Sequence, residues 1–183
     1  MRLLEYQKEV FETLRAPSKH SSVERKRAYM FVFVYILGLI AFAGCFFHFI
    51  SGWIAIIIVQ VVQTIMALIH AFNLNDYSEK TLSSMECERA CNPIIDAYLA
   101  IGVIQILQAV MCGSNIMTVV YVLSLLYGVW RSQKGHLYVD ATNLWRDVRK
   151  FEKEGYFLVG KEVIIVVLSL IVMVFSLVQR YSD

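Results

Sequence analysis

The sequence predicts an all-α integral membrane protein, a bundle of about five transmembrane helices with amphipathic cytosolic helices. Apolar side chains make up 58% of the 183 residues, which exceeds the roughly 45–50% of ordinary soluble domains. No Asp, Glu, Lys or Arg occurs between Ala28 and Asn73. That uncharged stretch is too long for one span, which needs about 20 residues, and therefore predicts two. The formal charge of +2 is too small to indicate a partner.

Residues 1–27 form a polar, cytosolic N-terminal segment. Apolar side chains recur on one helical stripe and predict an amphipathic helix that ends before Ala16-Pro17-Ser18: Leu3, Leu4, Val10, Phe11 and Leu14. The charged region is too long for a secretory signal peptide.

The first two spans are predicted at residues 28–50 and 53–73, with the break at Ser51-Gly52. Four polar side chains share roughly one side of the second span: Gln60, Gln63, Thr64 and His70. Polar groups in hydrocarbon turn toward protein, so we expect this face to pack against other spans or against a helix of another membrane protein. His70, near the end of the span, is expected to snorkel or to form a hydrogen bond at the interface.

Residues 74–93 are predicted to be a polar loop, in which Asn92-Pro93 ends the loop and places proline in the first turn of the next helix. Cys87 and Cys91 lie in this loop without a second ligand pair, so no zinc site is expected. A reducing compartment argues against a disulfide there. The other two cysteines, Cys45 and Cys112, lie in or at the end of apolar runs and are expected to act as small apolar side chains.

Residues 94–112 and 115–130 form a tight apolar hairpin joined at Gly113-Ser114. Its second arm is short and suits a thin membrane, such as that of the ER. Gln105 and Gln108 place two more amides near one face. The last span is predicted at residues 159–179, with Lys161 and Glu162 at its start, where charges remain solvated.

The loop at residues 131–160 contains a charged segment that predicts its own helix. Asp140 is a residue type that favours an N-cap, and apolar side chains follow at helical spacing, at Leu144, Val148 and Phe151. This amphipathic helix is expected to end near Gly155 and to lie along the membrane interface, with four basic side chains near anionic headgroups: Arg146, Arg149, Lys150 and Lys153. The alternative is a solvated connector between two spans.

The charges predict the orientation. Sixteen of the seventeen Lys and Arg residues lie before the first span or in and beside the loops 74–93 and 131–160, and only Arg180 lies on the other side. The positive-inside rule therefore places the N-terminus and both loops in the cytosol and the C-terminus in the lumen.

The run D-A-T-N-L-W-R-D-V at Asp140–Val148, followed by K-E-G and an apolar span, resembles the cornichon family of eukaryotic membrane proteins. Other matching positions are Cys87, Asn92, Pro93, Leu125, Tyr127, Trp130 and Arg131. The resemblance defines a cornichon-like four-helix domain at residues 51–183 and leaves residues 1–27 and the span 28–50 as additions. The N-x-P that family members often carry in their third span is absent, so that helix is expected to be straighter.

The resemblance implies a cargo receptor for ER-to-Golgi vesicle transport in the ER and Golgi membranes. Its expected partners are a COPII coat adaptor, membrane lipids and transmembrane clients such as transporters, channels and receptors. The implied coat-contact residues are Leu144, Trp145, Arg146 and Val148. Client helices are expected to meet the amide-bearing faces, at Gln60, Gln63, Thr64, Gln105 and Gln108. The alternative is an auxiliary subunit that modulates the trafficking and gating of an ion channel or transporter.

No motif in the sequence indicates an enzyme, a cofactor or a metal ion. Cys45 and His48 lie three residues apart, but without a carboxylate to orient the histidine they indicate ordinary packing. Nucleic-acid binding is not expected, because the basic residues follow the membrane boundary. A transporter acting alone is not expected either, since Asp96, Lys161 and Glu162 are all predicted at span ends.

Overall fold

The computed structural model describes residues 10–47, 49–135 and 137–182. The helical fold class is confirmed, since these residues form helices and contain no strand. The elements are a short 3-10 helix, η1 (Pro17–Lys19), and five α-helices: α2 (Ser22–Phe47), α3 (Phe49–Ser78), α4 (Ser84–Met111), α5 (Asn115–Gln133) and α6 (Leu144–Tyr181). Residues 10–15 are also helical, as expected; the earlier part of that predicted helix lies outside the described residues.

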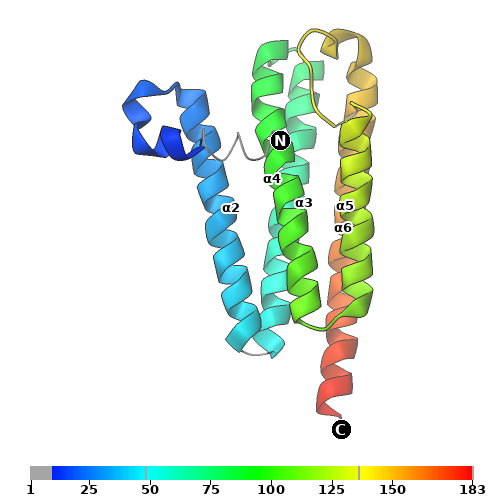
Figure 1. The fold of residues 1–183 in the computed structure, drawn as a ribbon. Coiled ribbons are helices and arrows are strands. Elements are labelled where there is room, and N and C mark those ends of the chain that lie inside the picture. The colour runs from blue at the N-terminus through cyan, green and yellow to red at the C-terminus, as the bar shows by residue number, and fades with distance from the viewer. Residues whose placement is uncertain (1–9, 48, 136, 183) are drawn as a thin grey trace.

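Four of the helices, α2, α3, α4 and α6, are long and apolar enough to cross a membrane by length and composition. The shortest, α5, has 19 residues. Figure 1 shows α4 and α6 descending in the same direction, with α5 running back between their ends. The helices of the bundle therefore alternate in direction, as expected of five successive spans. By length and composition, however, α5 is not among the four candidate membrane spans.

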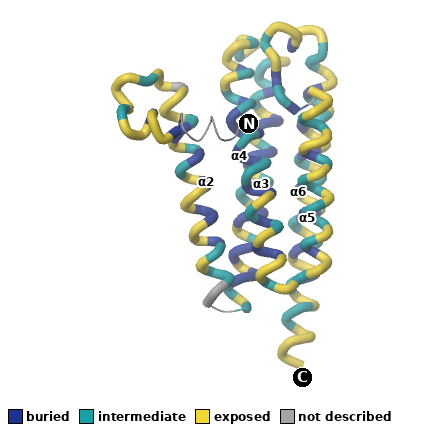
Figure 2. The backbone as a smooth tube through the Cα atoms, viewed as in Figure 1, coloured by how far each residue is buried: buried dark blue, intermediate teal, exposed yellow. Residues whose placement is uncertain are grey.

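The central helix, α3, packs against α2, α4 and α6. One core cluster lies between α2, α3 and α4 and includes Val34, Val59 and Ile101. Outer faces carry exposed large apolar side chains such as Leu39, Ile58, Leu123 and Ile164, and Figure 2 shows exposed residues along the outside of the helices. A soluble monomer rarely exposes apolar surface on this scale. The pattern is that of helices surrounded by lipid.

The predicted break between the first two spans was wrong. Ser51 and Gly52 lie inside α3, which begins at Phe49. The Ser51 hydroxyl donates to the carbonyl of Gly44 at 2.6 Å. A Cβ added at Gly52 would lie 2.8 Å from the Sγ atom of Cys112. These small residues therefore permit close contact between helices rather than a turn.

The loop between the second and third predicted spans is much shorter than the predicted residues 74–93. Helix α3 continues to Ser78, and α4 starts after Ser83, whose hydroxyl accepts from the backbone N–H of Glu86 in a capping box. Pro93 lies well inside α4 rather than in its first turn. Cys87 and Cys91 consequently lie in a helix, not in a loop. The extended helix ends are stabilised by a buried cluster that the local sequence does not reveal: Leu74, Cys87, Cys91, Val139, Leu144 and Phe151.

The hairpin between α4 and α5 is confirmed. Gly113 has a φ of +69°, which suits glycine, and the Ser114 hydroxyl accepts from the backbone N–H of Met117 at 3.4 Å to cap α5.

The prediction of a separate amphipathic helix that ends near Gly155 was wrong. Helix α6 is continuous over 38 residues, from Leu144 to Tyr181, so its first part stands in line with the last span instead of lying flat on the interface (Figure 1). Gly155 does not end the helix. A Cβ added there would lie 3.3 Å from the Cα atom of Ala71, so its glycine allows α6 to approach α3.

Candidate functional site

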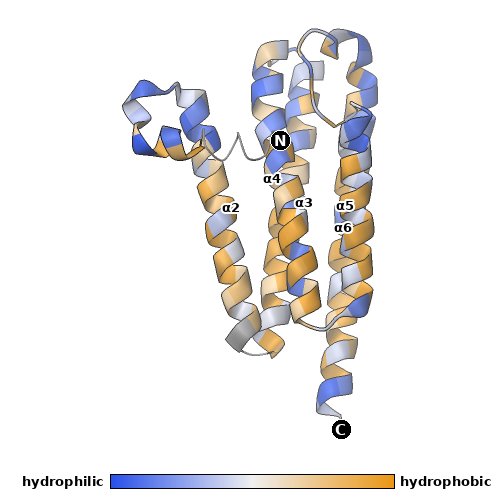
Figure 3. Ribbon diagram, viewed as in Figure 1, coloured by the Kyte–Doolittle hydropathy of each residue, from blue (hydrophilic) through white to orange (hydrophobic). Residues whose placement is uncertain are grey.

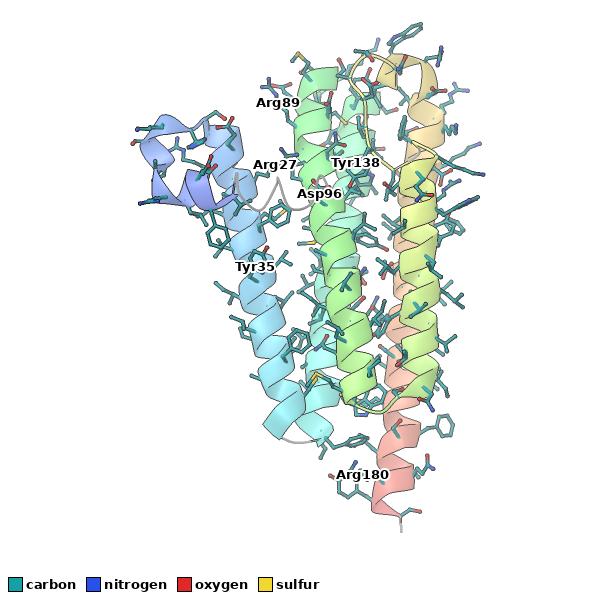
Figure 4. All side chains as sticks on the ribbon, in the orientation of Figure 1. Arg27, Tyr35, Arg89, Asp96, Tyr138 and Arg180 are labelled. Atoms are coloured by element: carbon teal, nitrogen blue, oxygen red, sulfur yellow. The ribbon has the colours of Figure 1, made fainter. Side chains whose placement is uncertain are left out.

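The connection between α5 and α6 contains an extended segment that is fastened to α4. We call residues 137–143 the strap. Asn92 forms two hydrogen bonds with Val139: its Nδ2 donates to the carbonyl at 3.0 Å, and its Oδ1 accepts from the backbone N–H at 2.9 Å. The hydroxyl of Tyr138 donates to Asp96 at 2.6 Å (Figure 4). The backbone N–H of Ala141 donates to Glu88 at 3.0 Å. Three residues of α4 therefore fix the strap.

Asp140 organises the turn that leads into α6. Its carboxylate accepts hydrogen bonds from the backbone N–H of Thr142 at 2.9 Å and from the Thr142 hydroxyl at 2.6 Å. These bonds hold the pKa of Asp140 below its usual value, because they favour the charged carboxylate. The N-cap of α6 is Asn143, not Asp140. Asp140 thus stabilises the turn before the helix, an arrangement typical of aspartate.

The four expected coat-contact residues do not share one surface. Trp145 is 73% exposed and Arg146 is exposed, whereas Leu144 is fully buried and Val148 is half-buried. The indole N–H of Trp145 donates to the carbonyl of Thr142 at 3.1 Å, so the exposed ring is oriented by the turn. The structure therefore brings Trp145 and Arg146 together at the surface and places Leu144 beneath them.

A groove borders this segment. Its volume is about 350 Å³, and it lies between the strap and the first turns of α6. Its lining includes two acidic side chains, Asp140 and Asp147, the basic side chain of Arg146, and the neutral side chains of Tyr138, Asn143 and Phe151. The groove therefore places two acidic side chains next to the exposed Arg146.

A second group of polar side chains lies inside the bundle. Glu162 is fully buried and accepts a hydrogen bond from Gln60 at 2.7 Å and one from the Tyr98 hydroxyl. Lys161 lies 2.9 Å from Glu162 and donates to the hydroxyls of Tyr98 and Ser124 at 2.8 and 2.7 Å. The network therefore joins α3, α4, α5 and α6.

The expected location of Lys161 and Glu162 at a solvated span end was therefore wrong. Glu162 is fully buried and Lys161 is largely buried among side chains of α3, α4 and α5, so neither charge is solvated. Two ionisable side chains are thus enclosed by the helices of the bundle.

The amide-bearing faces point into the bundle. Gln60, Gln63, Gln105 and Gln108 are all buried, and Gln105 donates to Gln60 at 2.7 Å. The half-buried Thr64 donates to the backbone carbonyl of Gln60 at 2.9 Å. These faces thus pack against spans of the same chain, and in this conformation the glutamines are closed to a client helix.

His70 is also buried, at 3% exposure, so the expectation that its side chain snorkels was wrong. Among the described residues no group of three or more His, Cys, Asp and Glu side chains is placed to hold a metal ion. His48 of the Cys45–His48 pair lies outside the described residues.

Sequence reasoning missed the residues that position the strap. Asn92 was noted only as part of the Asn92-Pro93 pair, and the sequence around Glu88 and Tyr138 does not indicate their contacts with the strap. The acidic residue Asp96 contacts both the strap and Arg27 of α2, the latter at 3.8 Å (Figure 4).

Comparison with known proteins agrees with this architecture. The family model described as "Cornichon protein" matches residues 49–172. The match begins at the first residue of α3 and includes the strap, the exposed pair Trp145 and Arg146, and the buried network around Glu162. No curated protein matches the chain, and no solved structure matches it. Because the family model covers more than half of the sequence, the chain belongs to the cornichon family.

Proposed function

We propose that this protein is a cargo receptor for transmembrane clients in ER-to-Golgi transport, and that Trp145 and Arg146 contact the COPII coat. The cornichon family acts generally in ER export and as auxiliary proteins of channels. The observation that carries the proposal is the pair of exposed side chains on the first turn of α6, with the Trp145 indole held in place by Thr142. Tryptophan and arginine are the residue types that most often dominate interface energies.

The length of α6 supports this assignment. Its 38 residues extend about 57 Å at helical rise, nearly twice the hydrocarbon thickness of about 30 Å. Trp145 precedes Lys161 by sixteen residues, about 24 Å along the helix. The first part of α6 therefore presents Trp145 and Arg146 beyond the lipid.

The proposed orientation places the strap and the N-terminus in the cytosol and the C-terminus in the lumen. Figure 3 shows hydrophilic residues concentrated at the end of the bundle that carries the strap, with apolar residues along the middle of the helices. The Lys and Arg content of that end supports the cytosolic assignment through the positive-inside rule.

Leu144 and Val148 have a different role in this proposal from that of the exposed pair. Leu144 packs against Cys87, Cys91 and Phe151, and so holds the first turn of α6 in place. Client helices pack against the exposed apolar outer faces, because the glutamines are closed within the bundle.

The test is the double substitution Trp145→Ala with Arg146→Ala. The variant is expected to fold and to copurify with clients but to accumulate in the ER and to lose binding to the purified coat adaptor. Arg149→Ala with Lys150→Ala is the matched control, since these exposed basic residues lie on the same helix outside the proposed contact. Unchanged ER exit of the first variant would count against the coat contact.

An auxiliary subunit of a channel or transporter is the second candidate. The broad exposed apolar surface, with side chains such as Ile54, Ile58 and Leu123, favours it as much as it favours a receptor, because either role needs a lateral contact with another protein's helices. Steady-state localisation discriminates. A cycling receptor remains in ER and Golgi membranes, whereas a permanent subunit follows its partner outward.

A further inference from the structure

Two cysteines from different helices meet at the end of the bundle opposite the strap. The Sγ atoms of Cys45 and Cys112 lie 3.8 Å apart, and both thiols are free. Cys45 is two residues from the end of α2, and Cys112 caps the C-terminus of α4 just before the Gly113-Ser114 turn. The contact therefore joins α2, which lies outside the family match, to a helix within it.

The surrounding packing keeps this pair in place. A Cβ added at Gly52 would lie 2.8 Å from the Sγ atom of Cys112 and 3.5 Å from the Cα atom of Cys45, so α3 is in close contact with both residues. A disulfide needs its sulfur atoms about 2.05 Å apart. The two sulfur atoms are already in contact at 3.8 Å, so bond formation requires them to approach by less than 2 Å, through rotation of the two side chains and adjustment of the helix ends.

We propose that Cys45 and Cys112 are a disulfide site that clamps α2 to the cornichon-family helices when the thiols meet an oxidant of the disulfide class. The proposal rests on the orientation given under the proposed function, which places this end of the bundle toward the lumen. The ER lumen is oxidising enough for disulfides to form and persist.

The chemistry is two successive thiol–disulfide exchanges. The thiolate of one cysteine attacks the oxidant disulfide, forms a mixed disulfide and releases one thiol. The thiolate of the second cysteine then attacks the sulfur of the first, which forms the Cys45–Cys112 bond and releases the second thiol. The protein loses two protons and two electrons, and the oxidant disulfide is reduced to two thiols.

The chain contains a matched internal control. Cys87 and Cys91 also have Sγ atoms 3.8 Å apart, but they lie one turn apart on α4, at the strap end. Side chains at this spacing on one helix have Cβ atoms about 5–6 Å apart, whereas a disulfide requires about 3.8 Å. This pair is also fully buried. It is expected to stay reduced.

The test uses the short connection between α3 and α4. A protease site inserted between Lys80 and Thr81, both exposed, separates Cys45 from the other three cysteines after cleavage. Membranes are first treated with N-ethylmaleimide to block free thiols, and the fragments are then compared on gels with and without reductant.

The wild-type fragments are expected to remain linked without reductant and to separate with it. Cys45→Ser and Cys112→Ser should each release the fragments, whereas the combined Cys87→Ser and Cys91→Ser control should leave them linked. Separate wild-type fragments would overturn the proposal. The purified protein treated with oxidised glutathione in detergent provides a second test, and failure to link there would show that the two thiols do not come close enough to react.

The two proposals fail in different ways. If the fragments stay linked and the Trp145 and Arg146 variant leaves the ER normally, the disulfide proposal is supported and the coat-contact proposal is contradicted. Tag mapping that places the N-terminus in the lumen would overturn the disulfide proposal, because the cysteine pair would then face a reducing compartment.

Discussion

The side chain of Gln60 donates a hydrogen bond to the Oε2 atom of Glu162 at 2.7 Å, which joins α3 to α6 across 102 positions of the sequence. Gln60 also accepts from Gln105 at 2.7 Å, so one amide connects three helices. All three side chains are buried. In a bundle surrounded by lipid, water does not replace such partners, and the network therefore fixes how these helices are positioned relative to one another.

We expect Glu162→Ala to destabilise the fold strongly. The substitution leaves Lys161 and Gln60 without their carboxylate partner inside the bundle, and breaking a buried pair in this way typically costs about 3–5 kcal/mol. The measurement is thermal or denaturant unfolding of the purified protein in detergent micelles.

Glu152→Ala is the control for that experiment, because Glu152 lies on the same helix and is half-exposed. The paired replacement Lys161→Met with Glu162→Leu should cost less than the sum of the two single substitutions, since residues in one network are coupled. Equal unfolding curves for Glu162→Ala and Glu152→Ala would contradict the structural role given to this carboxylate.

The long apolar stretches predicted the helices and the α4–α5 hairpin, because burial in lipid depends on composition over about 20 residues. The polar helix ends were not predictable in the same way. Leu74, Cys87 and Phe151 come from three helices and bury one another. The extension of each helix therefore depends on contacts between residues that are far apart in the sequence. The same applies to Gly155, whose sequence context suggests a helix end but whose contact with Ala71 needs a glycine.

The candidate site was located by its motif but not resolved into its parts. The spacing of Leu144 and Trp145 cannot show which of them is buried, since that depends on the cluster around Cys87 and Cys91. The strap is held by Asn92, which lies 47 positions before its partner Val139. The burial of Glu162 was not predicted, because it depends on contacts with Gln60 and Tyr98, which lie far away in the sequence.

Leu144 and Trp145, adjacent in the motif, should respond differently to truncation. Leu144→Ala removes a fully buried side chain and is expected to cost about 2–5 kcal/mol of stability. Trp145→Ala removes a side chain that is 73% exposed, and it should leave the unfolding transition nearly unchanged while weakening binding to the coat adaptor. Both quantities are measured on the same purified variants. A stable Leu144→Ala protein would show that the first turn of α6 does not depend on this contact.

Gly155 and Gly160 provide a matched pair on α6. A Cβ at Gly155 would lie 3.3 Å from both Ala71 and Leu74, whereas nothing lies within 4 Å of one at Gly160. Gly155→Val should therefore force α6 away from α3 and destabilise the protein by about 1–3 kcal/mol. Gly160→Ala should stabilise it by about 0.5–1 kcal/mol, because alanine favours a helix interior over glycine. Unfolding in detergent measures both, and a tolerated Gly155→Val would argue against the close approach of the two helices.

Asn92 is expected to control the order of the strap without controlling the fold. Its amide satisfies both backbone groups of Val139, and Asn92→Ala removes the donor and the acceptor together. The strap should then open more often, so hydrogen exchange at the Val139 amide should accelerate by about 5–30-fold, which corresponds to about 1–2 kcal/mol. Exchange in the middle of α3 should not change.

Asn92→Asp separates the two bonds. The carboxylate still accepts from the Val139 N–H but can no longer donate to its carbonyl, so exchange at Val139 should fall between the wild-type and alanine rates. Asn115→Ala is the control, since Asn115 is exposed at the other end of the bundle. Asn92 fixes Val139, which lies just before Thr142, and the Thr142 carbonyl orients Trp145. Binding of the coat adaptor should therefore weaken in the same order of variants. If adaptor binding stayed constant while Val139 exchange increased, the strap would not be what holds Trp145 in its binding position.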